Sequence, residues 1–358
     1  MENTFYPGAV MNKQRDNNYD LLRIVSAIAV ISIHVSSIYT HAFLEEGTLG
    51  QCYTDNIFVT CLYNALSRFA VPCFFMLSGA FILDDEKNAD FKFFYRKKFR
   101  KEGITALIFC GIYFLGTLVI AAIDVFIKGY GPWRLLSPVL NTLKGEPYYH
   151  LWYLFVLPGV YILTPIVIRV KKDIGEKLFV KAAWIFLVLS SVSYWTGTHR
   201  LNWDIGYQFY FLGYFMAGYV IRKWACNKKN NRKGICLIMI GIIIELLVAC
   251  LQYRQFTNAN PQYDLVSPLS PFIVVASVFI FGGFSLLTIR KDLRKASRHT
   301  FLIYLIHPGI LSVGEILFKK RLLEGDNRFI IPTSIVFVYL LSYMVALVYG
   351  KISNRKEL

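Results

Sequence analysis

Arg23 and His34 lie inside the first long apolar run of the chain, and their residue types can do chemistry. Their spacing of eleven positions is close to a whole number of helical turns, at about 3.6 residues each. Both side chains are therefore expected on one helix face, roughly 16 Å apart along the axis. Ionisable groups are costly within a bilayer and usually mark a site or a pathway. His34 suits general base catalysis near neutral pH; the structural alternative is a neutral imidazole bonded to a neighbouring helix.

Arg68 is a third ionisable residue at membrane depth, well inside the apolar run 57–83. An arginine there costs about 2.5–3.5 kcal/mol on insertion scales, so something buried must offset the charge. Glu245 and Glu315 are candidate partners, which would make Arg68 structural. An anionic ligand or reaction intermediate would instead make it functional, and the sequence leaves both interpretations open.

The stretch from Pro72 to Gly79 interrupts the same run and contains Ser78. Proline frees a backbone carbonyl, and glycine permits another backbone to approach closely. Discontinuous helices of this kind line buried cavities, although a harmless kink is the simpler alternative. We expect a helix break here and Ser78 in a binding site.

Two more segments place histidines beside aromatic residues. His150 and Trp152 open the fourth apolar run, where aromatic residues usually form an interfacial belt. Tyr304 and His307 lie in the ninth run, and Pro308 would open that helix again. These four residues are predicted to contact the donor or the acceptor.

The elements that must position these residues are membrane-spanning helices. The 358 residues are 55% hydrophobic and 17% charged, which is too apolar for one soluble domain of this length. A span needs about 20 mostly apolar residues. We therefore predict an all-α, polytopic transmembrane bundle of about ten spans, at 21–39, 57–83, 104–127, 151–168, 180–196, 205–221, 235–251, 268–289, 300–317 and 330–349.

The net charge of +16 sets orientation and does not indicate a nucleic-acid partner. Lys and Arg are roughly three times as frequent in one set of alternate loops as in the other, which predicts that both termini are cytoplasmic. We expect a tail at 1–20, a membrane domain at 21–350 and a tail at 351–358. The basic and aromatic segment 84–103 resembles an interfacial helix, serving as an anchor or as a docking surface for an anionic ligand.

Together these motifs resemble the acyltransferase 3 family of bacterial integral membrane acyltransferases, over residues 17–350. The matching elements are Arg23 with His34, the stretch 74–79, the segment 150–154 and the segment 303–308. The resemblance implies a ten-span core that transfers acetyl or other short acyl groups from coenzyme A thioesters to hydroxyls of cell-envelope glycans. It also implies the stand-alone membrane type, in the plasma or inner membrane.

On this interpretation Arg23 holds the donor, His34 is the base or carries the acyl group, and Arg68 stabilises the oxyanion. Acetyl-CoA is a substrate, and we expect no bound cofactor and no metal, since no cysteine or histidine pattern has metal-ligand spacing. The expected partners are the bilayer, acyl-CoA and an envelope glycan or lipid-linked sugar. The rival is a transporter or flippase for an amino acid or lipid-linked sugar, because related membrane domains joined to racemases are thought to handle amino acids.

Overall fold

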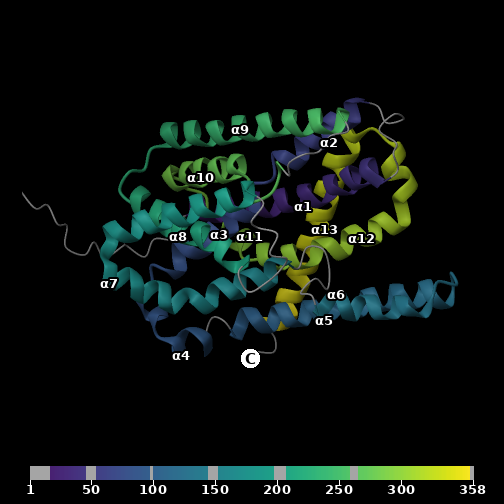
Figure 1. Cartoon of the computed structure of the whole chain (residues 1–358), viewed down its shortest axis with the longest axis horizontal. Helices are drawn as coiled ribbons and strands as arrows, with labels where there is room; N and C mark the ends of the chain where they lie inside the picture. The colour runs from purple at the N-terminus through teal and green to yellow at the C-terminus, as the bar shows by residue number, and fades with distance from the viewer. Residues whose placement is uncertain are drawn as a thin grey trace, which may run out of the picture.

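The computed structural model describes residues 17–45, 54–96, 100–143, 152–196, 207–258 and 265–354. This part of the chain is built of helices and their connections, without a strand (Figure 1). The predicted all-α architecture is therefore confirmed. The elements in chain order are α1 Asn17–Glu45, α2 Thr54–Ala65, α3 Ala70–Ile82, the 3₁₀ helix η2 Glu86–Ala89, α4 Phe91–Phe94, α5 Arg100–Phe126, the 3₁₀ helix η4 Pro132–Leu136, α6 Ser137–Leu143, α7 Trp152–Trp195, α8 Tyr207–Ala225, α9 Asn231–Thr257, α10 Pro271–Leu286, α11 Arg294–Ser297, α12 Thr300–Glu324 and α13 Asn327–Asn354.

Seven helical segments in the described residues are long and apolar enough to cross a bilayer, and α10 is a shorter apolar helix. Nine of the ten predicted runs each overlap one helix, and two of these, 151–168 and 180–196, share α7; the run 57–83 covers both α2 and α3. The chain is thus a multi-pass membrane protein. The count of about ten spans, the cytoplasmic side of both termini and the three-part domain division stay predictions.

Helix α7 changes direction at Gly175, where φ is 75° and ψ is 165°. A positive φ is readily adopted only by glycine, so this residue lets two apolar helices follow one another without a loop. In Figure 1, α8 lies against α3 near the centre of the bundle, while α5 lies along its edge.

The second predicted run is broken, as expected, but not at the expected place. Helix α2 ends at Ala65 and α3 begins at Ala70, so the break is a turn at 66–69. Pro72 lies in the first turn of α3, where its missing N–H removes no helical hydrogen bond. The proline therefore starts the second helix of the pair, and it does not interrupt a continuous one.

Close packing holds α3 against α8. A Cβ atom on Gly79 would overlap the carbonyl oxygen of Phe215, and one on Gly218 would overlap that of Met76. The absence of side chains at both glycines lets the two backbones touch, as the sequence predicted for Gly79. Phe75 and Phe211 stack beside this contact with ring centroids 4.6 Å apart, and the core of the bundle lies here.

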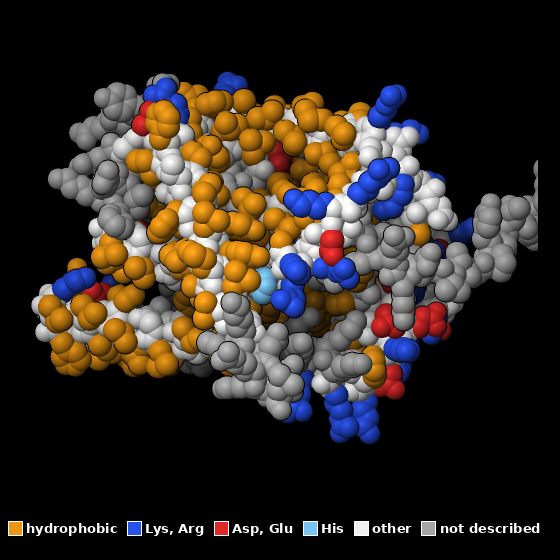
Figure 2. Space-filling model, turned by 180° about the vertical axis from the view of Figure 1, so that it is seen from behind, with side chains coloured by type: hydrophobic (Ala, Val, Ile, Leu, Met, Phe, Trp, Pro, Cys, Tyr) orange, Lys and Arg blue, Asp and Glu red, His pale blue; other side chains and the backbone are white. Residues whose placement is uncertain are grey.

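Apolar side chains cover most of one face of the molecule, and the Lys and Arg side chains of that face gather mainly toward one end (Figure 2). Many large apolar residues on α5, α9 and α13 are exposed. In a membrane protein such exposure is expected, because lipid replaces water around the helices. The polar and ionisable groups considered below lie instead in the interior of the bundle.

Candidate active site

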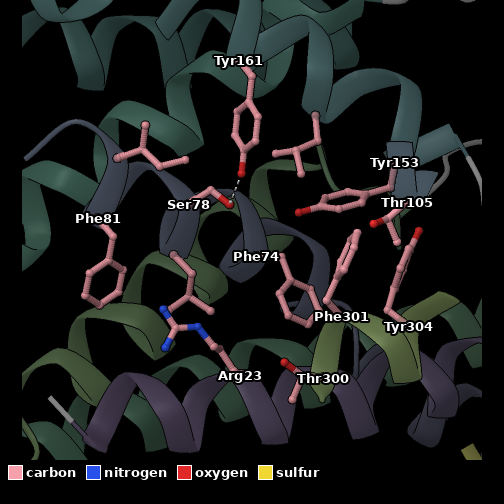
Figure 3. A pocket seen from close by; sticks show the side chains of 13 residues that line it. Arg23, Phe74, Ser78, Phe81, Thr105, Tyr153, Tyr161, Thr300, Phe301 and Tyr304 are labelled. Carbon is pink, nitrogen blue, oxygen red and sulfur yellow. Dashed lines mark hydrogen bonds between the residues drawn. The ribbon is translucent and has the colours of Figure 1, made fainter. Parts of the chain in front are cut away.

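A cavity of about 510 Å³ lies between α1, α3, α7 and α12. This volume is within the usual range for small-molecule sites, about 300–1,000 Å³. In Figure 3, Arg23 reaches into it from α1, Tyr153 and Tyr161 from α7, and Phe301 and Tyr304 from α12. The lining residues are Arg23, Phe74, Leu77, Ser78, Phe81, Ile82, Thr105, Tyr153, Leu157, Tyr161, Thr300, Phe301 and Tyr304.

Arg23 supplies the charged group of the cavity, and a buried carboxylate holds it in place. Its Nη1 lies 2.7 Å from Oδ1 of Asp20, whose side chain is completely buried. The same oxygen accepts a hydrogen bond of 2.8 Å from Ser297 Oγ. The guanidinium also lies 4.9 Å from the centre of the Phe81 ring, a favourable cation–π contact. The arginine is thus oriented, and a quarter of its side chain (26%) stays exposed.

His34 and His307 lie side by side, with ring centroids 5.2 Å apart and planes inclined by 31°. His307 is fully buried, whereas His34 is half-buried. Tyr304, which lines the cavity, has its ring 5.8 Å from that of His307. The histidine pair therefore lies one side chain behind the wall of the cavity.

The tautomer of His307 follows from its hydrogen bond. Its Nδ1 is 3.1 Å from the carbonyl oxygen of Ile303, which can only accept. Nδ1 must therefore carry the proton, and the neutral ring presents Nε2 as an acceptor. An imidazole in this state can receive a hydrogen bond from a neighbouring donor.

Pro308 next to His307 does not end the helix, because a tyrosine from α5 bridges two backbone groups of α12 by hydrogen bonds. Tyr113 Oη donates to the carbonyl oxygen of Leu305 at 2.7 Å and accepts from the N–H of Gly309 at 3.0 Å. A hydroxyl thus stands between two backbone groups that would bond directly in a regular α-helix. The expectation of an opened helix is met only in this local form, since α12 continues on both sides of Pro308.

Arg68 lies in the turn between α2 and α3, and Asn64 binds it directly. Nε and Nη2 of Arg68 donate to Oδ1 of Asn64 at 3.1 and 2.6 Å. The Asn64 amide nitrogen in turn donates to Ser36 Oγ at 3.0 Å and to Ser37 Oγ at 3.3 Å. This chain of hydrogen bonds connects Arg68 to α1 within one turn of His34. Arg68 also lies within electrostatic range of that histidine.

Glu245, one of the two partners that the sequence suggested for Arg68, bonds to the backbone. Its Oε1 accepts from the N–H of Phe69, the residue after Arg68, at 2.9 Å. Glu315 is on α12, and no contact between it and Arg68 is seen in the described residues. The Asn64 amide is thus a direct partner of Arg68.

The other predicted binding residues differ in their position relative to the cavity. Ser78 lines the cavity, with its Oγ 3.4 Å from the Tyr161 hydroxyl. Trp152 packs at 5.5 Å on Phe211 and does not line the cavity. His150 lies outside the described residues.

The predicted basic segment 84–103 has only a short helical part, α4, before a stretch outside the described residues. Phe94 of α4 is fully buried, whereas Lys92 and Arg96 are exposed. The described part thus has the expected division, with an aromatic side inward and a basic side outward. Neither exposed cation lines the cavity.

Several site residues were missed from the sequence. Asp20 and Asn64 stand three and four positions before the arginines they bind, which is the spacing of neighbours on one helix face, so this signal was available. Tyr153 lies in the segment 150–154, where the aromatic residues were expected to form an interfacial belt. Tyr113 carries no sequence signal, because its partner lies 192 positions away.

Comparison with known proteins agrees with this architecture. A family model described as an acyltransferase domain matches residues 16–350. An amino-acid racemase of Enterococcus faecalis is 24% identical over 331 residues, and a serine/alanine racemase of Enterococcus gallinarum is 24% identical over 338 residues. These matches cover 86% and 87% of this chain, but only 42% and 43% of the relatives. No solved structure gives a significant match.

Proposed function

Because this chain belongs to the acyltransferase 3 family, we propose that it is a membrane acyltransferase that moves an acetyl or other short acyl group from acyl-CoA to a hydroxyl of an envelope glycan or lipid-linked sugar. One observation carries the proposal. A cavity in the bundle has an oriented arginine, Arg23, in its wall and a pair of histidines directly behind another part of that wall. Acyl transfer from a coenzyme A thioester needs a site that binds an anionic, elongated donor, and it needs a base for the acceptor hydroxyl.

Arg23 holds the donor. Its guanidinium is fixed by Asp20 and Phe81 and still has exposed surface, so an anionic or carbonyl group of the donor can bind there without the arginine having to reorganise. The aromatic lining formed by Phe74, Phe301 and Tyr304 suits the less polar arm of the thioester.

His34 acts as the base, and His307 orients it. A hydrogen bond from one nitrogen of His34 to Nε2 of His307 would leave the other nitrogen of His34 to accept the proton of the attacking hydroxyl. The 5.2 Å separation of the rings and the tautomer of His307 support this arrangement. His34 as a transient acyl carrier is the variant of the same scheme, with the imidazole as nucleophile.

The reaction then balances as follows. The acceptor oxygen attacks the thioester carbon while its proton passes to His34, and a tetrahedral oxyanion forms. Arg68, held at fixed geometry by Asn64, stabilises that oxyanion in a site poor in water. The intermediate collapses, the carbon–sulfur bond breaks, and the coenzyme A thiolate takes the proton from His34.

The test uses the full chain reconstituted in vesicles with acetyl-CoA and an envelope glycan extract. The measurement is the appearance of free coenzyme A thiol together with label on the glycan. Release of coenzyme A thiol that depends on the added extract supports acyl transfer. The proposal would be overturned if the vesicles released no thiol with any acceptor but accumulated a labelled amino acid or lipid-linked sugar.

An amino-acid substrate is the second candidate, favoured by the names of the two relatives, both racemases. In that case the cavity binds the carboxylate at Arg23, and the protein carries the amino acid across the membrane. Uptake of labelled serine and alanine by the same vesicles separates this candidate from acyl transfer. On either proposal the protein resides in the plasma or inner membrane, with the bilayer as its partner.

A further inference from the structure

A second cavity, of about 520 Å³, lies between the second half of α7 and helices α8, α9 and α10. It shares no lining residue with the cavity that contains Arg23. Glu176, Lys223 and Trp224 line it and are themselves exposed, so the cavity is open to the surroundings of the bundle. The proposed acyl transfer makes no use of this space.

The body of this cavity is apolar and elongated. Val180, Leu237 and Phe279 are among its lining residues. Glu176 and Trp184 both line it and lie eight positions apart on α7, which is about 12 Å of helix. Many apolar side chains on the outer surfaces of α7 and α9 are exposed, as expected where lipid replaces water around the helices. A hydrocarbon chain of the bilayer is therefore the natural occupant of an apolar opening in this surface.

The mouth of the cavity combines a tryptophan with positive charge. Lys223 Nζ lies 2.7 Å from Oε2 of Glu176, so these two charges balance each other. Lys228 adds a further cation, with its Nζ 5.2 Å from the centre of the Trp224 ring. Tryptophan is enriched where a membrane helix meets the headgroups.

The segment 222–233, which connects α8 to α9, contains no acidic residue. Its basic residues are Arg222, Lys223, Lys228, Lys229, Arg232 and Lys233. Within the part of the chain that the structure describes, Lys228, Arg232 and Lys233 form no ion pair with a carboxylate. Positive charge is therefore in excess beside the mouth of the cavity, where it can attract an anionic headgroup.

We propose that this cavity binds one anionic phospholipid of the surrounding bilayer. One acyl chain lies against Val180 and Leu237, and the headgroup phosphate lies beside Lys228 and Trp224. Basic pockets between membrane helices are suited to anionic lipid headgroups, whereas a zwitterionic headgroup gains less from the excess positive charge. The site is separate from the proposed catalytic cavity, so the inference does not depend on acyl transfer.

Native mass spectrometry of the full chain in detergent tests the proposal. The protein is titrated with phosphatidylglycerol, or with phosphatidylcholine of the same acyl chains, and the Kd of the first bound lipid is measured. We expect phosphatidylglycerol to bind about fivefold more tightly or better, since one basic residue near an anionic headgroup already has an effect of this size. Equal affinity for the two lipids would overturn the proposal.

Gly282→Leu tests whether the acyl chain occupies the cavity. A Cβ atom on Gly282 would lie 3.9 Å from the side chains of Ile221 and Leu237, so a larger side chain enters the cavity without striking the backbone of a neighbouring helix. Phosphatidylglycerol should then bind about tenfold more weakly, as expected if about two methylene groups are no longer buried. Gly111→Leu is the matched control, because a Cβ atom there has no described atom within 4 Å. It should bind the lipid like the wild type.

Lys228→Gln tests the headgroup contact. It should weaken the binding of phosphatidylglycerol about fivefold and leave that of phosphatidylcholine unchanged. Lys92→Gln removes the same charge from an exposed lysine on α4, away from this cavity, and should have no effect. An equal loss in the two lysine variants would show diffuse attraction to the whole surface and overturn the proposal.

Thermal midpoints in detergent accompany each titration. Wild-type affinity in a Gly282→Leu protein with a normal midpoint would show that the lipid chain lies elsewhere and contradict the proposal. If Gly282→Leu fails to fold, the comparison of Lys228→Gln with Lys92→Gln decides the matter. None of these measurements requires turnover, so the lipid site is tested whether or not the protein transfers acyl groups.

Discussion

The rings of His34 and His307 lie 5.2 Å apart, although 273 positions separate them in the chain. They come from α1 and α12, the two helices that also carry Arg23 and Tyr304 into the cavity. Because His307 is buried and bonded to its own helix, it is suited to orient His34 and not to meet substrate itself. The two histidines are therefore expected to respond differently to substitution.

His307→Gln tests this division of roles. Glutamine retains an acceptor oxygen and can still fix His34, whereas His307→Ala cannot. We expect His307→Gln to keep a measurable fraction of kcat and His307→Ala to lose about 10²-fold or more, with KM for the donor nearly unchanged in both. Steady-state kinetics on reconstituted protein measures the difference. Equal losses in the two variants would show that His307 does more than orient its neighbour.

Arg23→Ala should abolish detectable transfer at a donor concentration near the wild-type KM, and leave membrane insertion intact. The reason is that the guanidinium is the only charged group in the cavity wall among the described residues. Direct binding of acetyl-CoA by calorimetry is the measurement, with Ser26→Ala on the same helix as control. Undiminished binding by Arg23→Ala would place the donor elsewhere.

Arg68→Lys is expected to insert and fold but to transfer slowly. Lysine keeps the charge, but it loses the planar pair of donors that bind Asn64 Oδ1. Removal of an oxyanion stabiliser costs about 10²–10³ in rate, so a loss of about 10- to 10²-fold is expected when the charge remains. A rate equal to wild type in single-turnover assays would show that the guanidinium geometry is irrelevant.

Tyr113→Phe should destabilise the protein. Without the hydroxyl, the Leu305 carbonyl and the Gly309 N–H lose the partner that joins them beside Pro308. Leaving a buried backbone group unsatisfied costs about 1–3 kcal/mol, so a lower thermal midpoint is expected. Tyr130→Phe, at an exposed tyrosine just beyond the same helix, is the control. Identical midpoints for the two variants would mean that the backbone closes its own hydrogen bond.

The fold class and several site residues were predictable because apolar composition and helical spacing are local properties. Arg23, Ser78 and Tyr304 were expected to take part in binding, and all three line the cavity. The helix break was also predicted, but its position was wrong. The sequence signal was Pro72, which favours the start of a helix as much as an interruption, and only the packing of α9 against the turn decides between them.

The partners across the bundle could not be predicted. Which helix lies beside which is a property of the whole packing, so the contacts His34–His307 and Glu245–Phe69 have no signature in a single sequence. The sequence proposed Glu245 as a partner for Arg68 on charge alone. The structure adds the Asn64 amide as a direct partner of Arg68 and places the Glu245 carboxyl on the backbone N–H of Phe69.

The most direct test of the account is the transfer of radiolabelled acetyl groups from acetyl-CoA to an envelope glycan extract by wild type and by His34→Ala. Both proteins are reconstituted at equal density, with Ser26→Ala as the folding control. The account predicts transfer by the wild type and the control, and none by His34→Ala at an unchanged thermal midpoint. Transfer by His34→Ala at the wild-type rate would contradict the assignment of the base, and with it the central claim.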